Sequence, residues 1–424
     1  MVTDLLRRTI LKKKEKFLFK RYEKGNIDFN AINNEVGIYI HIPFCKSICP
    51  YCPYNKVLYE KNKAQRYKEA LIKEILLYKE KIGDKKITSI YIGGGTPTLL
   101  IHELEDVLQV VQENYDFHGD IGIEIYPTAV NEELLCKLKE MKINLISLGV
   151  QTFDDEKLKF LGRAYTEKEI HKAITLIKTF HFQCVDIDIM TNIPGQTYED
   201  IKNDLEKVYA YEIDQLSIYP LIVFPMTSLS RRIKEKGLTR FSEWEEKKIL
   251  QMIDKISIEH GYERTSIWTY GKNTENRYTS VTRESFVGFG AGASSHFGNY
   301  FYMNTFHTDA YIKALEEEKI PINMVNTMTG REKMIFWLFW RCYDGVIDQK
   351  RFYELFGKDM KKEFQLLFVL LKLFLLGKEK NGKVVLTDLG RFIYHYVEKQ
   401  YSIHYLNYLW KRSMEEAWIE EIQI

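Results

Sequence analysis

The stretch GIYIHIPFCKSICPYC, residues 37–52, places a β-rich run directly before three closely spaced cysteines. Cys45, Cys49 and Cys52 follow the spacing C-x-x-x-C-x-x-C, and the chain has 6 cysteines in all. Three thiolates on one loop can bind three corners of an iron–sulfur cube and leave the fourth iron open. A structural zinc site usually has four ligands from two paired knuckles, and the sequence has no second knuckle. The pattern therefore favours a [4Fe-4S] cluster, with zinc and His41 as the alternative.

Working outward from the cysteines, short β-rich runs alternate with amphipathic helical patterns. Consecutive β/α units cross over right-handed, so six of them in a row predict a parallel sheet and an α/β fold. Residues that follow the strands then meet at the carboxyl edge of that sheet, where the chemistry of such folds is concentrated. The predicted strands are residues 37–43, 88–92, 121–126, 145–150, 184–190 and 215–219.

The alternation ends near residue 325, where the pattern becomes helical. From TGREKMIFWLFWRCYDGVI onward, GKVVLTDLGRFI is the only β-like interruption, which is typical of a winged-helix-like domain. We therefore predict an N-terminal helical extension (1–34), a core with a substrate-closing segment (35–324) and a smaller helical C-terminal domain (325–424).

The composition limits the partners and the compartment. The 61 basic and 59 acidic residues nearly cancel, and the C-terminal part has no clean basic stripe, so we expect no nucleic acid. The run FQLLFVLLKLFLLG is too short to span a bilayer, so we expect no transmembrane segment. The first twenty residues favour a solvated helix, with peripheral contact to anionic lipid as the alternative. The few scattered cysteines favour a reducing cytoplasm.

A second motif is YIGGGTPT, residues 91–98, whose glycines let the backbone approach a polar ligand closely. Together with YIHIPFCKSICPYC, EIYP, SLGVQTF and LGRAY, in this order and at strand ends, it resembles the radical S-adenosylmethionine enzymes. The similarity is to the branch related to oxygen-independent coproporphyrinogen III oxidase, and it covers roughly residues 35–400. It implies a partial (β/α)6 barrel. It also implies a [4Fe-4S] cluster that cleaves S-adenosylmethionine to a 5′-deoxyadenosyl radical, and an electron donor such as flavodoxin or ferredoxin.

The resemblance also implies roles for individual residues. The three cysteines bind the cluster and are catalytic, and Tyr51 within their loop is expected to bind the cofactor. The residues expected at the first S-adenosylmethionine are Tyr39, Gly93, Gly94, Gly95, Thr96 and Glu124. A second S-adenosylmethionine is expected at Gln151, Arg163 and Asp188. From the residues alone, Glu124 could instead face solvent, Arg163 could pair with a surface acid and Asp188 could cap a helix.

Two departures bear on the substrate. The oxidase has a further Cys two positions after the third, where this chain has Tyr54. The related heme chaperones carry a His-Asn pair before a Tyr-Trp, and the comparable stretch TENRYTS lacks both. We therefore predict radical methyl transfer to an sp2 carbon of a planar substrate, a tetrapyrrole, heme or a quinone-like molecule, with two S-adenosylmethionine molecules. Oxidative decarboxylation of the coproporphyrinogen oxidase type and non-enzymatic heme binding are the alternatives.

The same hypothesis assigns a substrate-closing role to residues 277–306. This segment contains glycines for tight turns and then Tyr300, Phe301, Tyr302 and Phe306, which we expect to stack on a flat substrate. Packing of these aromatic rings in the core is the alternative.

Overall fold

The predicted parallel strands are all present in the structure, a computed structural model that describes residues 2–9, 16–273, 278–279 and 284–424. They lie side by side in the order β9-β8-β7-β6-β5-β2, and each pairs with its neighbours in parallel. Their bounds are β2 Glu35–Ile42, β5 Lys86–Gly94, β6 Asp116–Ile125, β7 Leu145–Gln151, β8 Cys184–Thr191 and β9 Gln215–Pro220. The alternation of the sequence thus identified every strand of the barrel part.

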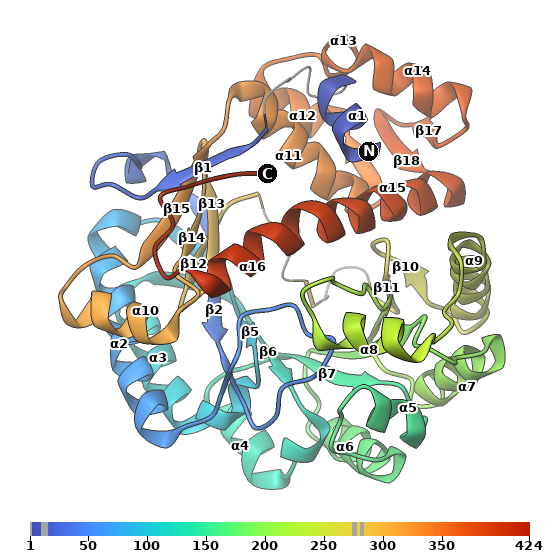
Figure 1. The fold of residues 1–424 in the computed structure, drawn as a ribbon, viewed down its shortest axis with the longest axis horizontal. Coiled ribbons are helices and arrows are strands. Elements are labelled where there is room, and N and C mark those ends of the chain that lie inside the picture. Colours follow the sequence, from blue (N-terminus) through green and yellow to red (C-terminus); the bar gives the residue numbers. More distant parts are fainter. Residues whose placement is uncertain (1, 10–15, 274–277, 280–283) are drawn as a thin grey trace.

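Helices follow the strands and form the outer layer of the barrel part (Figure 1). Helices α6 and α7 begin at capping boxes, in which Thr166 pairs with Glu169 and Thr197 pairs with Asp200. The helices of this part are α2 Lys61–Ile82, α3 Ile101–Asn114, α4 Glu132–Glu140, α5 Asp155–Phe160, α6 Glu167–Thr179, α7 Tyr198–Tyr209, α8 Ser228–Lys236 and α9 Glu243–Glu259. These connections bring the carboxyl ends of all six strands to one edge.

The sheet continues beyond β2 with strands from distant parts of the chain. The order is β2-β12-β13-β14-β15-β1-β19, and the pairs beyond β12 are antiparallel. Among the described residues the strand order runs from β10 to β19 without closing into a ring, so the barrel is partial. Two further strands pair beyond β9 on the other side. The bounds are β1 Leu18–Arg21, β10 Glu263–Arg264, β11 Thr269–Gly271, β12 Phe286–Phe289, β13 Ser294–Phe297, β14 Tyr300–Asn304, β15 Ile322–Thr327 and β19 Glu421–Gln423.

Two details differ from the predicted organisation. The N-terminal extension contains helix α1 (Val2–Thr9) and also β1, which pairs with both β15 and β19. The predicted boundary at 324/325 falls inside β15, and the C-terminal β19 returns to the main sheet. Strand pairs made by the two ends of a chain depend on contacts about 400 residues apart, which no local pattern in the sequence encodes.

The C-terminal part is mostly helical, as expected, and it adds a small sheet of order β16-β18-β17. Helices α15 and α16 are joined by a π-helical turn over Ser402–Leu406 and form one long run across the molecule (Figure 1). The elements are α11 Gly330–Tyr343, β16 Val346–Asp348, α12 Gln349–Phe356, α13 Met360–Glu363, α14 Gln365–Leu373, β17 Gly377–Lys380, β18 Lys383–Leu386, α15 Asp388–Tyr401 and α16 Asn407–Glu415. Within the part of the chain that the structure describes, no helix has the length and apolarity needed to cross a membrane.

A buried charge network joins α9 of the barrel part to α15. Glu246 accepts a hydrogen bond of 2.6 Å from Lys399 Nζ and lies 3.6 Å from the His395 ring. Burial alone would lower the pKa of His395, but Glu246 and Glu398 raise it above its usual value. Burial would raise the pKa of Glu246, but His395 and Lys399 lower it to about 2.

This network predicts a pH-dependent stability. The contribution of His395 is fully present below its unfolded pKa of 6.5 and is lost as the pH rises through the raised pKa. We expect His395→Gln to lower the free energy of unfolding by up to about 3 kcal/mol at pH 6 and by less at pH 9. The loss at pH 6 stays within this limit because Lys399 still neutralises Glu246 in the variant. Denaturant melts at both pH values measure this. His118→Gln is the control, because His118 forms an exposed ion pair with Asp116. A loss that is the same at both pH values would contradict the prediction.

Candidate active site

The cysteine loop begins at the carboxyl end of β2 and is closed by a two-strand pairing. Strand β3 (Phe44–Cys45) pairs in parallel with β4 (Val57–Leu58). Inside the loop, the Cys52 backbone N–H donates to the Cys49 carbonyl at 3.2 Å, and Lys56 Nζ donates to the Cys52 carbonyl at 2.6 Å. The backbone therefore fixes the three cysteines close to one another at the predicted edge of the sheet.

The three thiols are free and partly exposed. Burial raises the pKa of the Cys45 thiol to about 11, and the nearby Cys52 and Cys49 add to this, so the sulfurs share one local field. Among the described residues, no group of three or more His, Cys, Asp or Glu side chains has the geometry to hold a single metal ion. In a cubane each cysteine binds a different iron. The cysteine sulfurs are therefore farther apart than the ligands of a single metal ion. Three thiolates on one loop thus suit a cubane whose fourth iron needs no protein ligand.

The glycine loop packs against the cysteine loop. Gly95 N–H donates to the Ile42 carbonyl at 2.7 Å, and Thr96 N–H donates to the Phe44 carbonyl at 2.8 Å. A Cβ on Gly95 would lie 2.6 Å from the Phe44 oxygen and 2.9 Å from Cys45 Sγ. Only glycine therefore fits beside this cysteine.

His41 supports the loop. Its Nε2 lies 3.1 Å from the Asn55 carbonyl and its Nδ1 lies 3.0 Å from the Tyr39 hydroxyl. Burial lowers the pKa of His41 to about 4, so the ring is neutral at pH 7. Because both ring nitrogens have protein partners, His41 does not serve as a fourth zinc ligand in this arrangement. It connects Tyr39 on β2 to the cysteine loop.

Two carboxylates lie at the next strand ends. Glu124 on β6 accepts a hydrogen bond from Gly94 N–H at 3.1 Å, and Asp188 on β8 accepts one from Ser147 Oγ at 2.9 Å. Burial, with the charge of Asp188, raises the pKa of Glu124 to about 7. Burial also raises the pKa of Asp188 to about 6, although Ser147 and Arg163 oppose this. These groups face one another inside the barrel, so neither the solvent-facing alternative for Glu124 nor the helix-cap alternative for Asp188 describes them.

Arg163 lies between the cysteine loop and the barrel interior. Its guanidinium donates to the Tyr51 hydroxyl and stacks over the Tyr126 ring, 5.2 Å from the centroid. Its Nε atom is buried without a hydrogen-bond partner among the described residues. A buried N–H of this kind normally has an acceptor, so a ligand with an anionic or carbonyl group fits here.

Gln151 ends β7 in a strained conformation. Its φ is 73°, in the region that disfavours residues other than glycine, and the β7–β8 register shifts at this point. Its Oε1 accepts a weak hydrogen bond from the Tyr219 hydroxyl at 3.4 Å. Strain that the surroundings maintain at a strand end is common at ligand sites. The structure thus brings every predicted cofactor residue to one edge of the sheet.

The structure also adds residues that the sequence analysis missed. Ser147 contacts Asp188 and Tyr219 contacts Gln151. The period-two alternation of their strands could have identified both residues, because it places their side chains on the inner face. Tyr278 packs edge-on against Tyr91 at 4.9 Å and receives a hydrogen bond from Gln215 on its carbonyl. Thr274 and Glu275 of the TENRYTS stretch lie outside the described residues.

Three of the four expected stacking residues, Phe301, Tyr302 and Phe306, pack against other protein groups. The Tyr302 side chain is buried and receives a hydrogen bond from Tyr78, while Phe301 and Phe306 pack in a separate apolar cluster with Phe19. Tyr302 and Phe306 are buried, so the core-packing alternative describes them, while Tyr300 and Phe301 are only partly buried.

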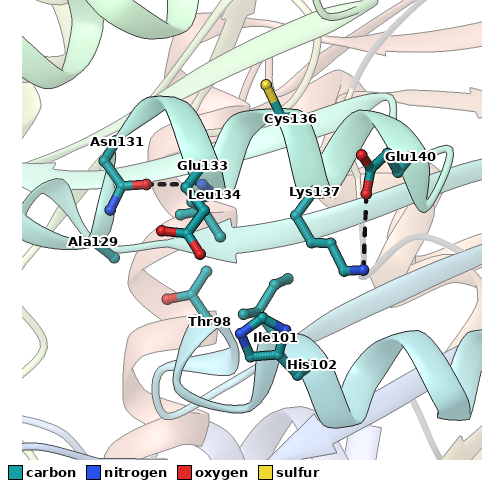
Figure 2. A pocket seen from close by; sticks show the side chains of 10 residues that line it. All are labelled: Thr98, Ile101, His102, Ala129, Asn131, Glu133, Leu134, Cys136, Lys137 and Glu140. Carbon is teal, nitrogen blue, oxygen red and sulfur yellow. Dashed lines mark hydrogen bonds and ion pairs between the residues drawn. The ribbon is translucent and has the colours of Figure 1, made fainter.

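A separate cavity of about 370 Å³ lies between α3 and α4 (Figure 2). Asn131 caps α4 there, and Lys137 reaches Glu140. None of the predicted site residues lines this cavity, so it does not belong to the strand-end site.

Comparison with known proteins identifies the family. Residues 39–208 match the radical SAM superfamily. The heme chaperone HemW of Bacillus subtilis (strain 168) is 30% identical over 332 residues, which are 76% of this chain and 87% of that one. The chain belongs to the radical SAM superfamily, in the branch related to oxygen-independent coproporphyrinogen III oxidase. The cofactors of this superfamily are a [4Fe-4S] cluster and S-adenosylmethionine.

Two further similarities are to a relative in sequence and to a solved structure with the same fold. The oxygen-independent coproporphyrinogen III oxidase of Pseudomonas aeruginosa is 27% identical over 318 residues, which are 70% of this chain and 69% of that one. Coproporphyrinogen III oxidase (HemN) from Escherichia coli, a radical SAM enzyme, has the same fold, with a TM-score of 0.78 and 21% identity over 93% of this chain and 98% of that chain. The predicted fold class, a partial radical SAM barrel with a smaller helical C-terminal domain, is confirmed.

Proposed function

We propose that this protein is a radical SAM enzyme that abstracts a hydrogen atom from a bound tetrapyrrole. The observation that carries the proposal is the convergence of the cysteine loop, the glycine loop and the Glu124–Asp188–Arg163 group at one sheet edge. The cluster and S-adenosylmethionine, when bound, supply reductive cleavage of a carbon–sulfur bond and hydrogen-atom abstraction.

The chain's own residues would hold these groups. Cys45, Cys49 and Cys52 would bind the cluster, with the neutral His41 fixing their loop through Asn55. Tyr39, Tyr51, the backbone of Gly93, Gly94, Gly95 and Thr96, and the Glu124 carboxylate would line the first S-adenosylmethionine site. A carboxylate next to a sulfonium ion is stabilised in its charged form, so binding would lower the raised pKa of Glu124. Gln151, Arg163 and Asp188 would line a second site.

The substrate class is supported by the relatives. Two similar proteins are named as a heme chaperone and as an oxidase of coproporphyrinogen III, and both names refer to tetrapyrroles. The methyl transfer predicted from the sequence has no counterpart among these relatives, so the alternatives of oxidation and heme binding have more support. We place the reaction in the cytoplasm, with a small electron-transfer protein as the reductant.

Anaerobic turnover tests this function. The protein, reconstituted with iron and sulfide, is reduced in the presence of S-adenosylmethionine and either coproporphyrinogen III or heme. We expect 5′-deoxyadenosine formation to rise at least about tenfold when the correct tetrapyrrole is present, because substrate binding completes the site. Loss of CO2 from the substrate would identify decarboxylation, and S-adenosylhomocysteine would identify methyl transfer. No stimulation by either tetrapyrrole would contradict the proposal.

Heme binding without turnover is the second candidate, and the identity to HemW over most of both chains favours it. In that case heme would bind at about one per chain, while S-adenosylmethionine cleavage would not respond to heme. The same titration and turnover measurements therefore separate the two functions.

A further inference from the structure

Three aromatic side chains from distant parts of the chain meet beside the cysteine loop. Tyr54 lies 5.6 Å from Trp410 of α16, with the ring planes at 49°. Trp410 stacks in turn on Phe224, at 5.6 Å and 27°. We call Tyr54, Trp410 and Phe224 the aromatic shelf. Phe224 is buried, but 56% of the Tyr54 side chain is exposed, so the shelf ends in an open ring.

The shelf is held in place by backbone contacts on both sides. The Met226 backbone N–H donates to Asn407 Oδ1 at 3.0 Å, which ties α16 to the loop after β9. The Leu229 backbone N–H donates to the Pro50 carbonyl at 2.9 Å, which ties α8 to the cysteine loop. The rings are therefore preorganised relative to the cysteines, which lowers the entropic cost of binding a rigid ligand.

Tyr54 also belongs to the cysteine loop. It stands two residues after Cys52, in the segment between β3 and β4, while Trp410 comes from α16. The exposed ring therefore lies where the cysteine loop meets the C-terminal helix, next to the candidate active site.

We propose that the exposed Tyr54 ring, backed by Trp410 and Phe224 of the aromatic shelf, is the surface on which the flat face of a conjugated tetrapyrrole, a porphyrin or heme, stacks. This inference rests on the proposed function and narrows its substrate class. Aromatic rings bind extended planar π-systems through offset stacking and apolar burial. A porphyrinogen has saturated carbon bridges between its pyrroles and is puckered, so it cannot cover the shelf in the same way. Tyr54 is thereby the residue that selects the oxidation state of the ring.

Binding measurements on the reconstituted holoprotein test the shelf. The probes are hemin, coproporphyrin III and coproporphyrinogen III, with dissociation constants from Soret shifts or tryptophan quenching under anaerobic conditions. We expect Tyr54→Ala to weaken both planar rings about 5- to 10-fold, as expected for loss of one stacked ring. Tyr54→Phe retains the ring and should restore affinity to within about 2-fold. Coproporphyrinogen III binding should change by less than about 2-fold.

Controls separate the possible failures. Tyr353→Ala removes another exposed tyrosine, on α12, and should leave porphyrin affinity unchanged. If Tyr54→Ala binds the planar rings as tightly as the unaltered chain does, the shelf is wrong while the proposed function stands. If the unaltered chain binds no tetrapyrrole, the proposed substrate class fails and the shelf with it. A fall in bound iron in Tyr54→Ala would assign the residue to the cysteine loop and overturn the inference.

Discussion

Replacement of any one of Cys45, Cys49 or Cys52 by Ala is expected to remove the cluster and all S-adenosylmethionine cleavage. Each thiolate binds a different iron, and a cubane held at only two corners is not retained through purification. Bound iron should fall from about four per chain to below about one, with loss of the cluster's visible absorbance. Formation of 5′-deoxyadenosine should fall below detection.

The chain offers a matched control in Cys136. This cysteine is exposed on α4, outside the strand-end site, so Cys136→Ala should retain full iron content and full cleavage. Cleavage that survives in any of the three loop variants would contradict the central assignment. Iron that is lost equally from Cys136→Ala would show that the measurement reports folding instead of ligation.

The barrel part could be predicted because its signals are local. Each of the six parallel strands, β2, β5, β6, β7, β8 and β9, is a short β-rich run between helical patterns, and motifs that follow strands must meet at one edge of a parallel sheet. Periodicity places Cys45 and Gly95 at this edge, the resemblance to the radical S-adenosylmethionine enzymes implies Glu124 and Asp188 there, and the contacts between their elements agree.

Other features depend on contacts that no local pattern encodes. The pairing of β1 with β19 and the contact of Tyr54 with Trp410 each join residues hundreds of positions apart. The sequence predicts a substrate role for Phe301 and Tyr302, whereas the structure packs both against protein. The sequence of an aromatic residue in a packed strand does not differ from that of one in a binding site, because only the folded surroundings distinguish the two. The unpartnered Nε of Arg163 also becomes visible only after the chain is folded.

Gly95→Ala is expected to disable the site almost as completely as loss of a cysteine. The new Cβ would lie 2.6 Å from the Phe44 carbonyl oxygen and 2.9 Å from Cys45 Sγ, closer than any stable contact. Neither atom can move freely, because the carbonyl accepts the hydrogen bond from Thr96 and the sulfur must stay within about 0.2 Å of its metal-bonding distance. The glycine loop must therefore shift, and a displacement of about 1 Å at a reacting centre costs on the order of 100-fold in rate.

Iron content and cleavage together separate the causes of that loss. Gly330→Ala is the matched control, since a Cβ there meets open space and the residue lies in the first turn of α11. We expect the control to match the unaltered chain in both measurements. If the Gly95→Ala protein keeps its iron but loses at least about 100-fold in cleavage, the damage lies in the S-adenosylmethionine site. If the Gly95→Ala protein loses its iron, the damage lies at Cys45. Full cleavage in Gly95→Ala would show that the glycine loop does not set the geometry of the site.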